Sequence, residues 1–325
     1  RARRGIVIAT GTEPSLPPIP GLAGTPYWTN REAIETEEVP ESLIVLGGGA
    51  IGAELAQVFA RFGAAVTVVE ALPQLLPAED PEAGELLAAV FGWEGIAVRA
   101  GARAEHAGYD GRQFTVSLAG GETLAAQRLL VATGRRATVA ALGVGAYGLD
   151  ETASSIATDE TMRAANGLWA IGDVTGKGAF THVAMYQAAI AAAGILGQDG
   201  PPADYRAVPR VTFTDPEIGA VGLTEAQARE RGMAVRTGIT QVPSSARGWI
   251  HRAGNDGFIK LIEDTGRGVL VGATSAGPAG GEVLGALAVA VHGQVPVAAL
   301  RAMIYAYPTF HRGIEDALRS LGGVS

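Results

Sequence analysis

Short apolar runs alternate along the chain with amphipathic stretches, and turns rich in glycine or proline separate them. Residues 43–70 give the clearest pattern. Leu43–Leu46 predicts a buried strand, residues 51–62 carry apolar side chains at helical spacing, and Val66–Val69 predicts a second strand. Gly63 is placed to end the helix. This order predicts a βαβ unit with parallel strands. We expect one apolar helix face made of Ile51, Leu55, Val58, Phe59 and Phe62.

The same patterns predict elements on both sides of this unit, and those beyond residue 205 are typical of an antiparallel sheet with helices. The predicted strands are Ile6–Ala9, Phe114–Leu118, Leu129–Ala132, Val211–Phe213, Phe258–Ile262 and Val269–Ala273. The predicted helices cover residues 81–92, 183–196, 224–231 and 281–292, and a last one carries Ile314, Ala317 and Leu318.

Composition narrows the class of protein. The chain has 325 residues, of which 47% are hydrophobic, enough for two or three domains. A net charge of −8 without a Lys/Arg run argues against nucleic-acid binding. The longest apolar stretch, 283–300, is interrupted by His292 and Pro296, which argues against a membrane span. The chain has no cysteine, which excludes disulfides and thiolate metal sites within it, and we expect a cytoplasmic location.

Three glycines between the first strand and the helix have the spacing G-x-G-x-x-G: Gly47, Gly49 and Gly52. In a dinucleotide-binding unit the first allows the tight turn, the second lets the backbone approach a pyrophosphate, and the third lets the helix pack on the strand. The start of the helix, with Ala50 and Ile51, would then present N–H groups to the phosphates. The spacing alone is weak evidence, but here the flanking strands and helix agree with it.

Glu70 ends the second strand, 18 residues beyond Gly52. A carboxylate there is placed to accept hydrogen bonds from ribose hydroxyls and to repel a 2′-phosphate. We therefore expect NAD rather than NADP. The alternative is a glycine-rich turn in another kind of α/β protein.

Short sequence phrases along the whole chain resemble those of one family, and they occur in the same order as in that family. They are Ala9-Thr10-Gly11, the 47–70 unit, Ala132-Thr133-Gly134-Arg135, Ala170-Ile171-Gly172-Asp173, Thr181-His182-Val183-Ala184, Phe213-Thr214-Asp215-Pro216-Glu217, Gly257-Phe258-Ile259-Lys260-Leu261 and Tyr307-Pro308-Thr309. With them the chain resembles the pyridine-nucleotide flavoprotein disulfide reductases, the group that holds lipoamide dehydrogenase, glutathione reductase and mercuric reductase.

The resemblance implies an α/β protein with three parts. Residues 25–145 would form a Rossmann-like NAD-binding domain, residues 1–24 with 146–204 part of an FAD-binding domain, and residues 205–325 an α+β domain that forms a homodimer. The family's first FAD fingerprint and redox cysteine pair do not occur in these residues. We expect an FAD-binding segment to precede residue 1, whereas the sequence leaves open whether a redox cysteine pair lies there, and we expect this chain alone to be inactive.

The resemblance also implies an FAD site at three positions. Asp173 would bond the ribityl chain of FAD, the backbone of Ala184 would donate to the flavin ring, and Gly11 would lie near the same cofactor. Taken without the family, the alternative for Asp173 is a helix N-cap.

Two residues are expected near NAD. Glu54 would lie at the nicotinamide end, close to the flavin, although a glutamate in the first turn of a helix also complements the helix dipole. Gly134 would face NAD. Arg135, its neighbour, is open between that role and a salt bridge that holds the domains.

The C-terminal end departs from the family. Lipoamide dehydrogenases carry a His and a Glu five positions apart, and this dyad moves protons at the dithiol across the dimer. Here Tyr307 and Arg312 occupy those positions. A phenol is a poor base at neutral pH, so we predict an inefficient lipoamide dehydrogenase. His311 could substitute as the acid/base, paired with Glu315. The cysteine pair that ends mercuric reductases is absent too.

These observations favour an FAD- and NAD-dependent oxidoreductase that passes hydride from NADH to flavin and then to a disulfide, quinone or metal ion. The alternative is a non-catalytic module for NAD binding and dimerisation. A stand-alone alcohol dehydrogenase is disfavoured because no catalytic Ser/Tyr/Lys or zinc set can be identified.

Overall fold

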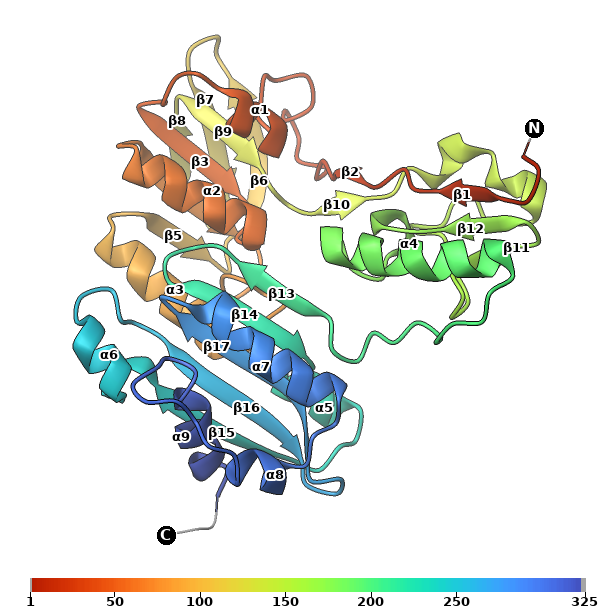
Figure 1. Cartoon of the computed structure of the whole chain (residues 1–325). Coiled ribbons are helices and arrows are strands. Elements are labelled where there is room, and N and C mark those ends of the chain that lie inside the picture. The colour runs from red at the N-terminus through yellow and green to blue at the C-terminus, as the bar shows by residue number, and fades with distance from the viewer. Residues whose placement is uncertain (1, 323–325) are drawn as a thin grey trace. The chain divides into compact units, whose positions relative to one another are not determined.

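The computed structural model describes residues 2–322. Their contacts form two compact units, one of residues up to 15 with 134–208 and one of residues 16–133 with 209 onward (Figure 1). The sequence predicts residues 16–24 with the first set and residues 134–145 with the second. Leu22 is instead fully buried against the strands of the second unit, and Val139 and Val144 pack with Ala170 and Val174 of the first. The assignment of functional domains stays a prediction.

The first unit is built on a small sheet in the order β1-β12-β11, with β1 and β12 parallel. A long helix, α4, belongs to the same unit (Figure 1). Its strands are β1 (Ile6–Ile8), β2 (Glu13–Pro14), β10 (Arg135–Arg136), β11 (Arg163–Ala165) and β12 (Leu168–Ala170), and its helices are α4 (Thr181–Leu196) and the short 3₁₀ turns Val139–Leu142, Val144–Tyr147 and Asp173–Thr175.

The second unit contains the predicted βαβ unit within a parallel sheet of order β5-β4-β3-β9. Helices α2 and α3 pack on one face of this sheet, and an antiparallel sheet of order β6-β7-β8 covers the other. The elements are α1 (Asn30–Glu35), β3 (Ser42–Leu46), α2 (Ala50–Arg61), β4 (Ala65–Glu70), α3 (Pro81–Trp93), β5 (Ala97–Ala100), β6 (Ala104–Tyr109), β7 (Phe114–Leu118), β8 (Thr123–Ala126) and β9 (Arg128–Val131).

The buried face of α2 differs from the predicted one. Phe59 is buried as expected, but Val58 and Phe62 are exposed. The residues that face the sheet are mainly small ones such as Ala53 and Ala56, together with Gly52. The prediction was wrong because the helix approaches the strand closely, so bulky side chains have no room on that side.

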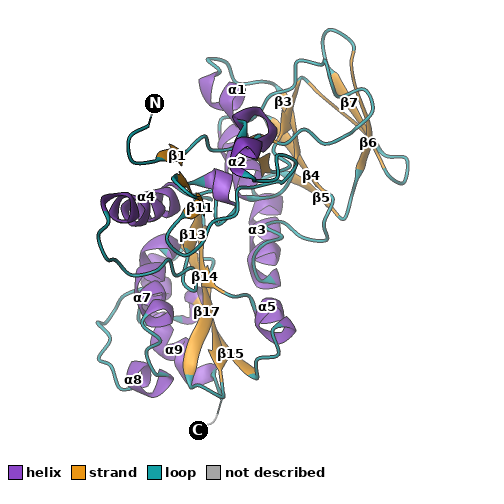
Figure 2. Cartoon of the chain, turned by 90° about the vertical axis from the view of Figure 1, so that its right-hand side faces the viewer, coloured by secondary structure: helices purple, strands orange, loops and turns teal. Residues whose placement is uncertain are grey.

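The rest of the second unit is an antiparallel sheet of order β13-β14-β17-β16-β15, as the sequence predicted. In Figure 2 this sheet is seen nearly edge-on, with α7 on one side and α5 on the other. Helix α9 packs on β15 and β16. The elements are β13 (Pro209–Thr212), β14 (Glu217–Gly222), α5 (Glu225–Glu230), β15 (Val235–Gln241), a 3₁₀ turn (Val242–Ser244), α6 (Ala246–His251), β16 (Phe258–Asp264), β17 (Val269–Gly277), α7 (Gly280–His292), α8 (Val297–Arg301) and α9 (Gly313–Ser320).

The predicted α/β class with an antiparallel C-terminal sheet is confirmed. Among residues 2–322, no helix is both long and apolar enough to cross a membrane. In the same range, no group of three or more His, Asp or Glu side chains is arranged to hold a metal ion.

Candidate functional site

The three fingerprint glycines meet three different surroundings. Gly47 has a φ of +105°, and a Cβ on it would lie 2.4 Å from the carbonyl oxygen of Ala132 in the neighbouring chain segment. A Cβ on Gly52 would lie 1.9 Å from the carbonyl oxygen of Gly47. A Cβ on Gly49 would meet nothing within 4 Å. Two glycines therefore allow close packing, and the third leaves an open approach to the backbone, as a pyrophosphate requires.

Helix α2 starts directly at this open position. Its N-cap is Gly49, and the helical hydrogen-bond ladder begins with the Ala53 N–H, which donates to the Gly49 carbonyl. The N–H groups of Ala50, Ile51 and Gly52 precede that ladder. These donors, together with the helix dipole, suit a phosphate group. The backbone from Gly49 to Gly52 thus fits the dinucleotide that the sequence predicted.

Glu70 lies beside the glycine loop and is 7% exposed. One carboxylate oxygen accepts the Gly48 N–H at 2.7 Å, and the other accepts the Leu72 N–H at 2.8 Å. The side chain therefore ties the loop to the residues after β4. Each carboxylate oxygen has a second lone pair, which leaves acceptor capacity for a ribose hydroxyl.

Glu54 has a structural partner that the sequence did not predict. Its carboxylate accepts the Phe213 N–H at 2.8 Å. One helical turn further along α2, the Gln57 amide exchanges two hydrogen bonds with the backbone of Asp215, and Arg61 pairs with the Asp215 side chain at 2.8 Å. One stripe of α2 thus holds the loop before β14. Burial raises the pKa of Glu54, and the Phe213 N–H offsets only part of this effect.

Replacement of Glu54 by Gln is expected to stabilise the fold at neutral pH. The raised pKa means that the ionised form of Glu54 is disfavoured in the folded state, so the wild type is relatively more stable below the ordinary value of 4.5 and loses this stability as the pH rises. The amide keeps an acceptor for Phe213. Because the group is partly solvated, we expect a melting temperature only about one to two degrees higher.

Thermal melts of Glu54→Gln across a pH series test this expectation, with Glu35→Gln on the exposed end of α1 as the control. The gain should shrink as the pH falls through the raised pKa of Glu54 and should be lost below 4.5, where Glu54 is neutral in both the folded and the unfolded wild type. A gain that is equal at all pH values would contradict it.

In the first unit, the turns that follow β1 and β12 lie side by side because these strands are parallel neighbours. The Thr12 hydroxyl donates to the Asp173 carboxylate at 3.0 Å, and the Arg135 guanidinium donates to the Thr12 hydroxyl at 2.8 Å. Arg135 and Asp173 themselves are 4.0 Å apart. Gly11 has a φ of +68° and a Cβ there would meet nothing within 4 Å. The structure thus brings Gly11 and Asp173 to one edge, at the carboxyl ends of parallel strands, where α/β folds bind ligands.

The expectation for Ala184 needs correction. Its N–H donates to the Phe180 carbonyl at 3.1 Å, as the first bond of the α4 ladder. A flavin ring at this helix start would meet the preceding N–H groups, including those of Thr181 and Val183. Gln187 carries no signal in the sequence, yet it is fully buried and accepts the Gly172 N–H at 2.6 Å, so that it fixes the turn before Asp173.

Gly134 has a φ of +118°, and a Cβ there would meet nothing within 4 Å. Its carbonyl accepts the Ser15 N–H at 2.9 Å. The position is therefore an open turn that only glycine adopts readily, which is compatible with the predicted role near a nucleotide.

At the C-terminal end, Tyr307 is 69% exposed and the guanidinium of Arg312 lies over its ring at 5.4 Å. The predicted His311–Glu315 pair does not form. Glu315 instead pairs with Arg312 at 3.0 Å and with Arg319. A cavity of about 200 Å³ adjoins Tyr307 and Arg312. Arginine side chains are strong partners for a carboxylate, and two of them lie within reach of Glu315, which explains the difference.

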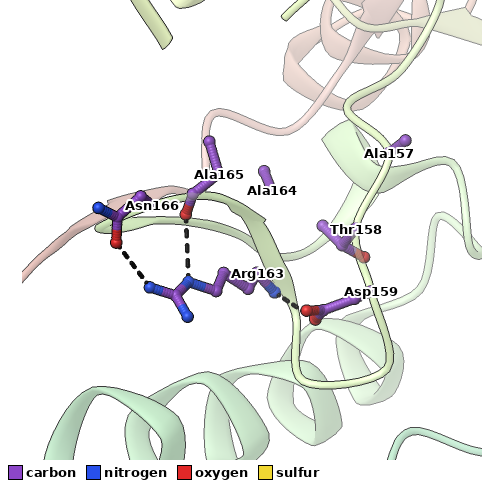
Figure 3. A pocket seen from close by; sticks show the side chains of 7 residues that line it. All are labelled: Ala157, Thr158, Asp159, Arg163, Ala164, Ala165 and Asn166. Atoms are coloured by element: carbon purple, nitrogen blue, oxygen red, sulfur yellow. Dashed lines mark hydrogen bonds between the residues drawn. The ribbon is translucent and has the colours of Figure 1, made fainter. Parts of the chain in front are cut away.

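Another pocket lies in the first unit between the hairpin of β11 and the preceding loop (Figure 3). The Arg163 guanidinium donates to the Ala165 carbonyl and, at 2.8 Å, to the Asn166 side chain. Asp159 accepts the backbone N–H of Arg163 at 2.9 Å. None of the predicted site residues lines this pocket, so it adds nothing to the cofactor sites.

Comparison with known protein families matches most of the chain. The family described as pyridine nucleotide-disulphide oxidoreductase matches residues 3–188, and its dimerisation domain matches residues 208–318. Mercuric reductase of Shigella flexneri is 37% identical over 97% of this chain, which spans 56% of that protein. Dihydrolipoyl dehydrogenase of Chlorobaculum tepidum is 36% identical over 98% of this chain, which spans 70% of that protein. The chain thus spans a little over half the length of mercuric reductase.

Solved structures show the same fold. LpdA of Mycobacterium tuberculosis superposes with a TM-score of 0.86 at 29% identity, over 98% of this chain and 69% of that one. The HOCl-induced flavoprotein disulfide reductase RclA of Escherichia coli has a TM-score of 0.86 at 30% identity, over 97% of this chain and 73% of that one.

Proposed function

Because the chain belongs to the pyridine nucleotide-disulphide oxidoreductase family, we propose that it acts in an oxidoreductase that takes hydride from NADH through FAD. The observation that carries the proposal is the glycine loop. Gly47 and Gly52 are packed against backbone, Gly49 is open, and Glu70 is held beside them. FAD, when bound, supplies an acceptor for the hydride of NADH and passes the electrons to the next acceptor.

The residues of this chain would divide the work as follows. The N–H groups of Ala50, Ile51 and Gly52 would bind the pyrophosphate of NAD, and Glu70 would accept hydrogen bonds from the ribose hydroxyls. Glu54 lies one turn further along the same helix and would border the nicotinamide end. In the first unit, Asp173 would hold the ribityl chain of FAD, kept in place by the hydroxyl of Thr12.

The identity of the final acceptor depends on the C-terminal end. Tyr307 and Arg312 occupy the positions where relatives of the lipoamide dehydrogenase kind are expected to carry an acid/base dyad. The carboxylate of Glu315 already forms ion pairs with two arginines. His311 therefore lacks a carboxylate to orient it among the described residues. We propose slow turnover with lipoamide and an acceptor that needs no proton from such a dyad, for example a quinone or a metal ion.

A second candidate function is a non-catalytic module for NAD binding and dimerisation. It is favoured by the contacts of Glu315, which pairs with Arg312 and Arg319 and not with His311, so that these residues form no acid/base dyad. Absorbance separates the two candidates. A purified chain that keeps flavin, absorbs near about 450 nm and is bleached by NADH without oxygen supports the oxidoreductase. A colourless chain that binds NADH supports the module, and a chain that binds neither cofactor contradicts both.

We also propose that the C-terminal part forms a homodimer. Ile304 is 96% exposed, and Met303 and Tyr307 are largely exposed near it, more apolar surface than a solvated loop needs. The expected result is a dimer at micromolar concentration, which Ile304→Asp converts to a monomer. Sedimentation velocity measures this, with Ile34→Asp on the exposed face of α1 as the control. A monomeric wild type would contradict the proposal.

A further inference from the structure

The chain contains two lysines, Lys177 and Lys260, against 23 arginines. Lys260 lies on β16, and its side chain is only 4% exposed. Its ammonium group contacts three carboxylates, those of Asp80 at 3.2 Å, Glu82 at 2.8 Å and Glu225 at 3.2 Å. A compact ammonium with three donors can serve three separate acceptors, which the planar fork of an arginine cannot do equally well.

A second cation on the same antiparallel sheet contacts Glu79, the residue that precedes Asp80. Arg210 on β13 makes a two-pronged contact with Glu79, at 2.6 and 2.7 Å. Both partners are mostly buried. The carboxylates of Glu79, Asp80 and Glu82 are therefore held by two cations on the C-terminal sheet, 131 and 178 to 180 residues further along the chain. Glu79 and Asp80 directly precede helix α3, and Glu82 lies in its first turn.

Asp80 shows that this contact takes priority over local structure. It occupies the N-cap position of α3, yet its side chain makes no hydrogen bond to its own helix. Its carboxylate instead contacts Lys260 and accepts the Glu225 N–H at 3.1 Å. An aspartate at an N-cap normally binds the N–H groups of its own first turn. Here it serves as the link between α3 and the C-terminal sheet.

The segment 71–80, which precedes this link, forms one wall of the glycine loop. The Leu72 N–H donates to Glu70 at 2.8 Å, and the Leu76 N–H donates to the Gly48 carbonyl at 2.8 Å. The Leu75 side chain lies against Gly48, 2.6 Å from where a Cβ would stand. The position of Glu70 and Gly48 therefore depends on where this segment is held.

We propose that Lys260, assisted by Arg210, is a positioning residue for NADH. It anchors the end of segment 71–80 through Asp80 and Glu82, and the segment in turn holds Glu70 and Gly48 at the ribose end of the cofactor site. The inference rests on the proposed function, because it concerns the same NADH site. It predicts that the C-terminal sheet contributes to cofactor affinity without touching the cofactor.

The charge state of Lys260 is consistent with this role. Burial disfavours the ammonium, but the hydrogen bond with Glu82 and the charges of Asp80 and Glu82 outweigh burial, so the pKa of Lys260 is raised above 10.5. The anchor therefore stays charged through neutral pH and weakens only as the pH rises beyond that value. The charge of Glu225 also persists, because its bond with Arg229, and then that with Lys260, lowers its pKa.

The test is the double variant Asp80→Asn/Lys260→Met in the full chain, with Lys177→Met as the matched control. Removal of both charges avoids a lone buried ion, which a single replacement would leave. NADH affinity is measured by fluorescence titration, and hydrogen exchange is measured over residues 71–80. We expect NADH to bind at least about fivefold more weakly, the lower end of coupling between separate sites, with faster exchange in that segment. Retained flavin and the control should be unchanged.

Two further variants guard against simple misfolding. The single variant Lys260→Arg keeps the charge and should bind NADH more tightly than the double variant does. Glu82→Gln, at a side chain that is 36% exposed, removes the shortest contact without burying a new group and should weaken NADH binding less than the double variant. Unchanged NADH affinity in a folded double variant overturns the inference, and so does weaker binding with unchanged exchange over 71–80. A wild type that does not bind NADH overturns the proposed function instead.

Discussion

Gly52→Ala is expected to abolish NADH binding and to lower stability. A Cβ at this position would lie 1.9 Å from the Gly47 carbonyl oxygen and 3.1 Å from its carbon. Both atoms are backbone, so no side chain can rotate away, and helix α2 would have to move off β3. Such overpacking costs about 1–3 kcal/mol of stability. The shift also displaces the N–H groups of the helix start, and we expect at least about a hundredfold weaker binding, a loss of roughly 2.8 kcal/mol.

Gly49→Ala distinguishes an effect on cofactor binding from an effect on folding stability. A Cβ at Gly49 would meet nothing within 4 Å of the chain, so the protein should fold with nearly wild-type stability. The added methyl would instead occupy the approach to the pyrophosphate, and NADH binding should fall. Gly92→Ala, at an exposed position in α3 that also has nothing within 4 Å, is the matched control and should gain up to about 1 kcal/mol from helix propensity.

Titration with NADH and thermal melts of the three variants give the readout. The expected pattern is loss of both properties for Gly52→Ala, loss of binding alone for Gly49→Ala, and loss of neither for Gly92→Ala. Normal NADH binding by Gly49→Ala would show that the open side of the loop does not face the pyrophosphate.

The sequence predicted the glycine loop because its physical demands are local. A tight turn, a close helix and an open backbone each require glycine, and the chain places one at each position. The family follows from short phrases with fixed order, and the matches at residues 3–188 and 208–318 confirm it. The buried face of α2 was predicted wrongly, because a periodic count of apolar residues favours Phe62, whereas close packing at Gly52 favours Ala53 and Ala56.

Contacts between residues far apart in sequence could not be predicted, because they leave no local pattern. The turn that holds Glu79 and Asp80 could be recognised as acidic, but nothing local indicates that Arg210 and Lys260 supply the counter-charges. The bond from Phe213 to Glu54 is of the same kind. At α4, the bond from the Ala184 N–H to the Phe180 carbonyl likewise becomes visible only in the hydrogen-bond ladder of the helix.

The carboxylate of Glu70 is expected to give a strong preference for NADH over NADPH. Its two oxygens are held by the N–H groups of Gly48 and Leu72, and the side chain is 7% exposed. A fixed, partly desolvated negative charge cannot move away from a 2′-phosphate, and in such surroundings charge repulsion is weakly screened. We expect at least about a hundredfold preference, equivalent to roughly 2.8 kcal/mol.

Glu70→Gln should reduce this preference by about tenfold and weaken NADH binding as well. The amide keeps one acceptor, but its NH₂ group then faces either Gly48 or Leu72, where an N–H already points, so one hydrogen bond is lost and the loop is less well held. Parallel titrations with NADH and NADPH measure the ratio of affinities, with Glu35→Gln as the control for loss of a negative charge. If the wild type binds NADPH as tightly as NADH, Glu70 does not face the ribose, and its hydrogen bonds to Gly48 and Leu72 are its whole role.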